Sequence, residues 1–130
     1  INYPKVHLKN GSIKNDQSNT RGNFKPTVRV LKNIKASMVD NGYIQKTLAP
    51  SYFLECLIYN STNSNFLKST YTEITVSIIN QFSNDLQSGM MANYLVQNEQ
   101  RKLFGSEDQQ WNIEDASIFV NQLIKFWNEF

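Results

Sequence analysis

The sequence predicts an all-α fold, a small helical bundle of about four main helices, with an extended segment at the N-terminus. Three observations support this class. Apolar residues recur at helical spacing in four stretches, turn and capping residues bound those stretches, and there is no set of alternating segments that could pair into a sheet. With 130 residues, 40% of them hydrophobic, the chain has the size and composition of one folded domain. Helices with one apolar face bury it against each other, as in a bundle.

The N-terminal part of the chain is the exception to the helical pattern. Residues 1–8 alternate crudely between apolar and polar side chains, which favours a β-strand. A strand without a partner is not stable in water, so we expect this one to belong to a sheet in a separate domain. Residues 10–23 are rich in Asn, Ser, Gly, Lys and Thr and predict a mobile loop or linker. We therefore assign residues 1–23 to an extended segment and linker, and residues 24–130 to a helical domain.

The first predicted helix begins near Phe24 and ends before Gly42. Pro26 fits its first turn, where a missing N–H is not needed, and glycine is favoured just past a helix end. At 100° per residue, one side of this helix is apolar, with Leu31, Ile34 and Met38.

The opposite side of the same helix is cationic. Lys25, Arg29 and Lys32 follow the spacing i, i+4, i+7 and lie together, with Lys35 beside them. The charge of the whole chain is also unevenly distributed, because residues 1–35 carry +7 and the remainder carries −5. This asymmetry indicates an anionic partner for the N-terminal third, although a merely solvated basic face has the same appearance.

A second helix is predicted to begin at Pro50, with Ser51 and Tyr52 in its first turn. A helix start presents free N–H groups and the positive end of the helix dipole, and so favours an anion. A cationic helix face joined by a short loop to such a start is suited to hold a polyphosphate. The apolar stripe of this second helix consists of Phe53, Leu54, Leu57 and Ile58.

Two further helices complete the predicted bundle. Thr70 and Glu73 fit a capping box, and Gly89 ends the helix that follows. Residues 90–105 lack a clear period and predict a long packed connection. Asn112 caps the last helix. The predicted apolar faces are Tyr71, Ile74, Ile78, Phe82 and Leu86 in one helix, and Ala116, Phe119, Val120, Leu123 and Trp127 in the other.

Several kinds of active site are excluded by composition. Cys56 is the only cysteine and His7 the only histidine, so the chain has no intrachain disulfide, no Cys-based zinc site and no His-pair metal motif. There is no Ser–His–Asp set, no Walker loop and no HExxH motif. Gly11-Ser12 is present, but no Asp-x-Asp pair follows it to hold magnesium. We therefore expect no catalytic residue and no metal ligand in this chain, and no activity of the chain alone.

Several segments together resemble a known family. They are YPKVHLKNG at 3–11, FKPTVRVLKNIK at 24–35, APSYFLECLIYN at 49–60, LFG at 103–105 and QWNIEDASIFVNQLIKFWNEF at 110–130. In this order they resemble the C-terminal half of bacterial cyclic GMP–AMP synthase-like and oligoadenylate synthase-like nucleotidyltransferases, the cyclic-oligonucleotide synthases of antiphage defence. The most specific piece is APSYFLECLIYN after a basic VRVLKN helix. The Gly-Ser motif and metal-binding carboxylates of that family belong to an N-terminal α/β palm domain, which this sequence does not contain.

The resemblance implies roles for particular residues. It places triphosphate contacts on Lys32 and Ser51, and stacking on a nucleobase on Tyr52. Lys25 and Arg29 are weaker candidates, which would either support these contacts from behind or contact a neighbouring phosphate. It also implies nucleoside triphosphates (ATP or GTP) and the palm domain as partners, with Mg²⁺ bound by that palm and not by this chain.

Three functions follow, and the first two are of different classes. The first is a nucleotide-recognition lid of a nucleotidyltransferase that makes cyclic or linear oligonucleotides. The alternative is a stand-alone basic helical module that binds nucleic acid or a protein through a stripe formed by Lys14, Arg21, Lys25, Arg29 and Lys32. A helical scaffold whose charge serves only solubility is a third. The sequence shows no signal peptide and no apolar run of membrane-spanning length, which predicts a cytoplasmic location.

Overall fold

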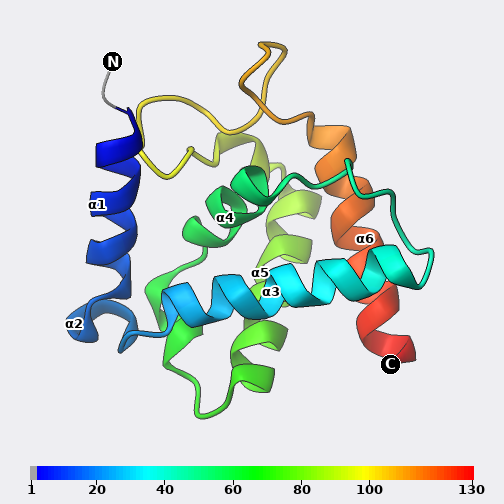
Figure 1. The fold of residues 1–130 in the computed structure, drawn as a ribbon, viewed down its shortest axis with the longest axis horizontal. Helices are drawn as coiled ribbons and strands as arrows, with labels where there is room; N and C mark the ends of the chain where they lie inside the picture. Colours follow the sequence, from blue (N-terminus) through cyan, green and yellow to red (C-terminus); the bar gives the residue numbers. More distant parts are fainter. Residues whose placement is uncertain (1–2) are drawn as a thin grey trace.

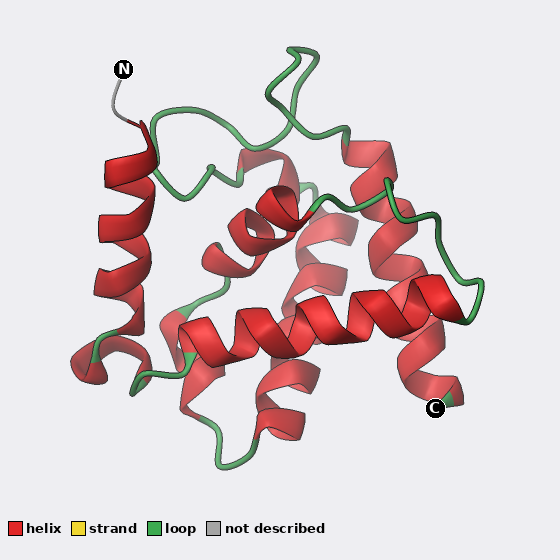
Figure 2. Cartoon of the chain, viewed as in Figure 1, coloured by secondary structure: helices red, strands yellow, loops and turns green. Residues whose placement is uncertain are grey.

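The computed structural model describes residues 3–130, apart from the side chain of Tyr3, and this part of the chain is helical with no strand (Figure 2). The prediction of an all-α fold is confirmed. The elements in chain order are α1 (Tyr3–Asn15), α2 (Gln17–Thr20), α3 (Phe24–Asp40), α4 (Ser51–Tyr59), η1 (Asn63–Leu67), α5 (Tyr71–Ser88), η2 (Met90–Asn93) and α6 (Ile113–Glu129). The four predicted helices correspond to α3 to α6.

Helix α3 is central to the packing of the helices. It runs across the molecule and contacts α1, α4, α5 and α6 (Figure 1). Its predicted apolar side faces these neighbours: Leu31 and Met38 are buried, and Ile34 packs against the same core. Its cationic side is consequently left for the surface, because one face of an amphipathic helix must remain outside the core.

The predicted ends of α3 and α4 are also confirmed. Pro26 lies in the first turn of α3, and the helix stops at Asp40. Gly42 has φ of +78°, a left-handed conformation that costs glycine little, and lets the chain turn away from α3. Pro50 is the residue immediately before α4, so Ser51 and Tyr52 open that helix as predicted.

Thr70 and Asn112 cap α5 and α6 as predicted, although the Glu73 carboxylate accepts from the Thr70 hydroxyl, at 3.1 Å, where a capping box has it accept from the Thr70 N–H. Thr70 Oγ1 accepts a hydrogen bond from the Glu73 N–H at 3.1 Å, and Asn112 Oδ1 accepts one from the Glu114 N–H at 2.7 Å. Gly89 follows α5 with φ of +84°. One residue of the predicted apolar faces differs: Tyr71 is 45% exposed, since it is the first residue of α5 and lies beyond the packed part of the helix.

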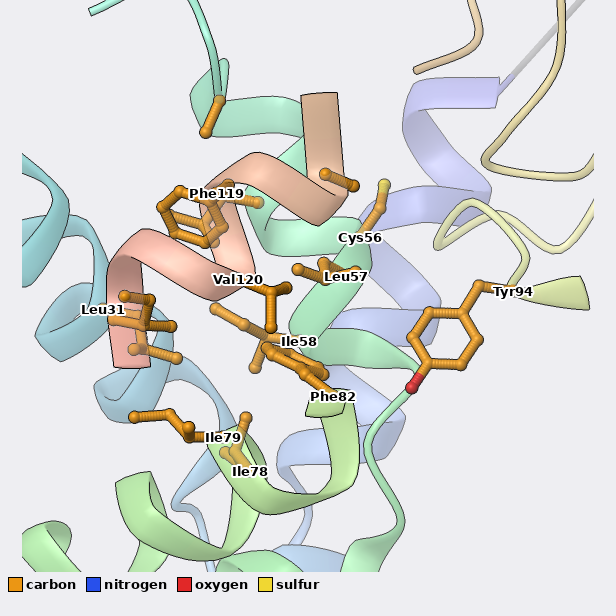
Figure 3. Packing of buried hydrophobic residues seen from close by; sticks show 14 of the residues in the cluster. Leu31, Cys56, Leu57, Ile58, Ile78, Ile79, Phe82, Tyr94, Phe119 and Val120 are labelled. Carbon is orange, nitrogen blue, oxygen red and sulfur yellow. The ribbon is translucent and has the colours of Figure 1, made fainter. Parts of the chain in front are cut away.

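A single core joins the four main helices. Leu31, Phe82 and Val120 come from α3, α5 and α6, and all three are buried in one cluster with residues of α4 (Figure 3). The connection over residues 90–105 adds Tyr94, Val96, Leu103 and Phe104 to this core, as expected for a packed segment. Cys56 is buried in the same cluster, where it packs as a small apolar residue.

The prediction of an extended N-terminal segment is wrong. Ile1 and Asn2 lie outside the described residues, but residues 3–15 form α1 instead of a strand, and residues 10–23 continue it into α2 instead of forming a mobile loop. Hydrogen bonds order this turn: the Asp16 carboxylate accepts from the Ser18 N–H at 2.9 Å, and the Thr20 hydroxyl donates to the Lys14 carbonyl at 2.6 Å. The assignment of residues 1–23 to a separate domain and linker stays a prediction.

The physical reason for this error lies in how α1 is held. Its sequence has no apolar stripe, and polar contacts with the bundle fix it instead. Asn10 Nδ2 donates to the Gln97 carbonyl at 2.9 Å, and the Gln97 side chain donates to the His7 carbonyl at 2.8 Å. Gly11 permits this approach, because a Cβ at that position would lie 2.5 Å from Gln97 Nε2. Such contacts between residues far apart in the sequence leave no periodic signal.

Candidate functional site

The cationic side of α3 borders two adjacent pockets, and Lys32 belongs to both. The first, which we call the α1–α3 pocket, has a volume of about 200 Å³ and is lined by Leu8, Gly11, Phe24, Lys25, Val28, Arg29, Lys32, Glu55 and Gln97. The second, the lysine pocket, has a volume of about 340 Å³ and is lined by Lys32, Lys35, Ala36, Val39, Asp40, Lys46 and Ser51. Only the lysine pocket reaches the range of about 300–1,000 Å³ that is typical of ligand sites.

Lys32 and Ser51 are therefore brought to the same pocket by different elements. Lys32 lies on α3, and Ser51 is the exposed first residue of α4. No side chain caps the start of α4, where Pro50 occupies the cap position. The free N–H groups of this first turn and its positive dipole end thus lie at the edge of the lysine pocket, an arrangement that attracts an anion.

Glu55 is an acidic neighbour that the sequence reading did not connect with Lys32. Its Oε1 lies 3.8 Å from Lys32 Nζ, and its Oε2 lies 2.9 Å from His7 Nε2. The side chains of Lys32 and Glu55 are 39% and 26% exposed, so the pair remains accessible to solvent. Glu55 therefore offsets part of the positive charge of Lys32 and ties it, through His7, to α1.

Tyr52 does not line the lysine pocket, since consecutive residues of a helix point about 100° apart. Its side chain is 47% exposed and stacks on the imidazole of His7 with ring centroids 5.5 Å apart. It borders a neighbouring hollow with Pro4, Leu8 and Asn98. Partial burial raises the pKa of Tyr52 to about 12, so its hydroxyl is neutral at physiological pH. Tyr52 thus presents an accessible ring beside the pocket that holds Ser51.

Lys25 and Arg29 lie away from Ser51, in the α1–α3 pocket. Both are exposed, and Lys25 Nζ donates to the Ser12 hydroxyl at 3.4 Å. Lys32 is the residue that connects this pair with the lysine pocket. The predicted set is therefore split into Lys32 with Ser51 in one pocket, Lys25 with Arg29 in the next, and Tyr52 beside them.

Lys14, the first member of the alternative basic stripe, is engaged inside the protein. Its ammonium donates to the Ser61 carbonyl at 2.6 Å and to Asn63 Oδ1 at 3.0 Å. Burial lowers the pKa of Lys14 to about 8. Three rings, those of Phe24, Tyr59 and Phe66, lie 5.1–6.0 Å from the ammonium. Because this charge is already satisfied, it is poorly placed to follow a nucleic-acid backbone.

The described residues offer few ligands for a divalent metal ion. Within residues 3–130, no group of three or more His, Cys, Asp and Glu side chains converges on one point. Asp40 is the only carboxylate among the residues that line the lysine pocket, and lysines surround it. These residues do not fit a Mg²⁺ site, because Mg²⁺ takes oxygen ligands in octahedral geometry.

Lys46 is the pocket residue that the sequence analysis missed. It lies on the loop between α3 and α4, four residues before Pro50, and no periodic pattern marks a loop lysine. Its position just before a helix start that is predicted to bind an anion could have indicated a role for Lys46.

Each helix among the described residues is too short or too polar to cross a bilayer.

The fold and pocket together define an all-α module with a cationic pocket at a helix start, which is a class suited to anion recognition. Comparison with protein families makes this specific. Residues 9–128 match the model of the cGAS/DncV-like nucleotidyltransferase C-terminal helical domain. The chain belongs to this family, and the resemblance drawn from its segments is confirmed.

Curated relatives agree with this assignment. The chain is 39% identical over 130 residues to the cyclic nucleotide synthase CdnE01 of Staphylococcus haemolyticus, with all of this chain and 42% of the relative covered. It is also 39% identical over 127 residues to the cyclic UMP-AMP synthase of Rhodothermus marinus, with 98% of this chain and 41% of the relative covered. The chain thus spans less than half the length of these relatives.

Solved structures show the same fold. The CdnE c-UMP-AMP synthase of Rhodothermus marinus, solved with Apcpp and Upnpp, matches 99% of this chain and 41% of its own, with a TM-score of 0.87 and 39% identity. The CdnE cyclic dinucleotide synthase of Elizabethkingia meningoseptica, solved with GTP and Apcpp, matches 97% of this chain and 44% of its own, with a TM-score of 0.81 and 30% identity. Both structures hold nucleotides with phosphate tails.

Proposed function

We propose that this chain is the nucleotide-recognition lid of a Mg²⁺-dependent nucleotidyltransferase that joins nucleoside triphosphates into cyclic or linear oligonucleotides. The single observation that carries the proposal is the meeting of Lys32 and Ser51 in one pocket at the start of α4. Family membership supports it, because relatives of this family are named as cyclic nucleotide synthases.

In this proposal each residue has a defined contact. The Lys32 ammonium is a point charge for a phosphate oxygen of the triphosphate. Ser51 supplies its hydroxyl and the free N–H groups of the first turn of α4. Tyr52 offers a ring to a nucleobase, with stacking worth about 1–3 kcal/mol by analogy with single-stranded nucleic-acid sites. Lys25 and Arg29 contact a neighbouring phosphate from the α1–α3 pocket.

The part played by the helical domain is positioning. In the intact protein a 3′ or 2′ hydroxyl attacks the α-phosphorus of a nucleoside triphosphate, and pyrophosphate leaves. Holding the triphosphate in line with that hydroxyl lowers the entropic part of the barrier. Mg²⁺ belongs to the palm domain in this proposal, since the described residues of this chain do not fit it. The chain alone is accordingly expected to bind nucleotides weakly and to turn none over. For the whole protein, we propose the synthesis of antiphage signalling molecules in the cytoplasm.

The proposal is tested by titrating ATP or GTP into the 130-residue chain and observing heat or chemical shifts. Weak binding is expected, and Lys32→Ala or Ser51→Ala should reduce it strongly, while Lys68→Ala, which removes an exposed charge elsewhere, should not. Efficient turnover of ATP by the isolated chain with Mg²⁺ would contradict the proposal. The alternative of a nucleic-acid module predicts RNA or DNA binding that falls steeply with salt and shows no preference for nucleotides.

A further inference from the structure

The lysine pocket contains more positive charge than the proposed contacts of Lys32 and Ser51 use. Lys35 lies one turn further along α3, and Lys46 comes from the loop between α3 and α4. Asp40 is the one acidic residue of the lining, so the pocket keeps a net positive charge. Three ammonium groups and one helix start border a single volume of about 340 Å³.

The loop that carries Lys46 is fixed to the core on both sides of it. Before Lys46, the Tyr43 carbonyl accepts a hydrogen bond from Gln122 Nε2 at 2.8 Å, and Ile44 is buried. After it, the Leu48 carbonyl accepts one from Trp111 Nε1 at 3.2 Å. Ala49 is fully buried as well. Lys46 therefore projects from a backbone that is already ordered, which reduces the entropy lost when its ammonium binds an anion.

The three lysines also affect one another. Burial lowers the pKa of Lys35, and the nearby charges of Lys46 and Lys32 lower it further. Like charges held this close repel, and an anion placed among them removes the repulsion. The cluster is thus better suited to a ligand with several negative charges than to water.

We propose that Lys35 and Lys46, together with Lys32 and Ser51, form a site for a polyphosphate chain and give it a preference for triphosphate over monophosphate. The inference rests on the proposed function and adds to it the residues that select a ligand by its number of phosphates. A monophosphate carries about two negative charges at neutral pH, and each additional phosphate adds roughly one. A single phosphate group is satisfied by Lys32 and the helix start, whereas the ammonium groups of Lys35 and Lys46 require a further phosphate in the lysine pocket.

The test compares phosphate number at constant ionic strength. ATP, AMP and inorganic tripolyphosphate are titrated into the wild-type chain and into Lys46→Gln, Lys35→Gln and Lys32→Ala. Lys68→Gln is the matched control, since it removes one exposed positive charge from the loop after η1. Circular dichroism verifies that each variant is folded. Lys46→Gln and Lys35→Gln are each expected to weaken ATP and tripolyphosphate roughly five-fold, as for the loss of one solvent-exposed ion pair, and to leave AMP unchanged.

The outcomes separate the two proposals. If Lys46→Gln and Lys35→Gln bind ATP as the wild type does while Lys32→Ala does not, the polyphosphate site is wrong and the proposed function stands. Equal weakening of ATP and AMP also overturns it, because the preference for phosphate number is then absent. If wild-type chain binds neither ATP nor tripolyphosphate, or if Lys32→Ala changes nothing, both proposals fail.

Discussion

The carboxylate of Glu55 lies 3.8 Å from the ammonium of Lys32 and lines the α1–α3 pocket, next to the lysine pocket where the triphosphate is proposed to bind. The same carboxylate contacts the imidazole of His7 at 2.9 Å, so one side chain of α4 contacts both α1 and α3. An anionic ligand would compete with Glu55 for the charge of Lys32. This competition is a direct consequence of the geometry, since one ammonium is shared between two negative groups.

Glu55→Gln is accordingly expected to raise the affinity of the chain for ATP. Removal of the competing charge releases Lys32, and the gain is limited to about 0.2–1 kcal/mol, or roughly 1.5- to five-fold, because the pair is partly exposed to solvent. Isothermal titration at low and at high salt measures it, and the gain should shrink as salt rises. Glu107→Gln, at an exposed loop position, is the control. A weaker affinity in Glu55→Gln would mean that Glu55 orients Lys32 instead of competing for it.

Thr70→Ala is expected to destabilise the bundle by about 1 kcal/mol, within the range of about 0.5–2 kcal/mol for the loss of a helix N-cap. The Thr70 hydroxyl accepts the Glu73 N–H at 3.1 Å, and the substitution leaves that N–H without its partner. Urea unfolding followed by circular dichroism gives the change in free energy. Thr72→Ala makes the same chemical change at an exposed position two residues later and should stay within about 0.5 kcal/mol. Equal effects of the two substitutions would show that the cap contributes nothing.

The helical bundle was predictable because its signals are local. Pro26, Gly42, Thr70 and Asn112 each mark a helix end through backbone chemistry that does not depend on the rest of the molecule. The apolar stripes between them follow the helical period, and Leu31 and the other stripe residues accordingly lie in the core.

Helix α1 and two side chains near Lys32, those of Lys46 and Glu55, were not predictable in this way. Helix α1 depends on Gln97, which is about ninety residues away in sequence, and its alternating residues imitate a strand. Lys46 has no partner in a periodic pattern, and the position of Glu55 outside the apolar stripe of α4 does not indicate which side chain it contacts. Both lie close to Lys32 only because α4 packs against α3, and a single sequence does not specify that packing.

Cys56 provides a test of the core that needs no ligand. Its side chain is fully buried on α4, and this burial raises the pKa of the thiol from 9.0 to about 11. At pH 8 the thiolate fraction is then about 0.1% in the folded chain, against roughly 10% when unfolded. Iodoacetamide at pH 8 is therefore expected to label the folded chain very slowly and the chain in urea quickly. Cys56 is the only cysteine, so mass spectrometry assigns every adduct to it.

The same shift of the Cys56 pKa predicts how stability depends on pH. Because the pKa is higher in the folded state, the unfolded state releases its proton first as the pH rises above 9. The contribution of the neutral thiol is fully present below pH 9, and the free energy of unfolding falls as the pH rises from about 9 to about 11. Cys56→Ala lacks this contribution, so the difference between its unfolding curve and that of the wild type should change across this interval. A difference that stays constant from pH 8 to 11, together with rapid labelling of the folded chain, would place Cys56 at an accessible surface and contradict the packing of α4 described above.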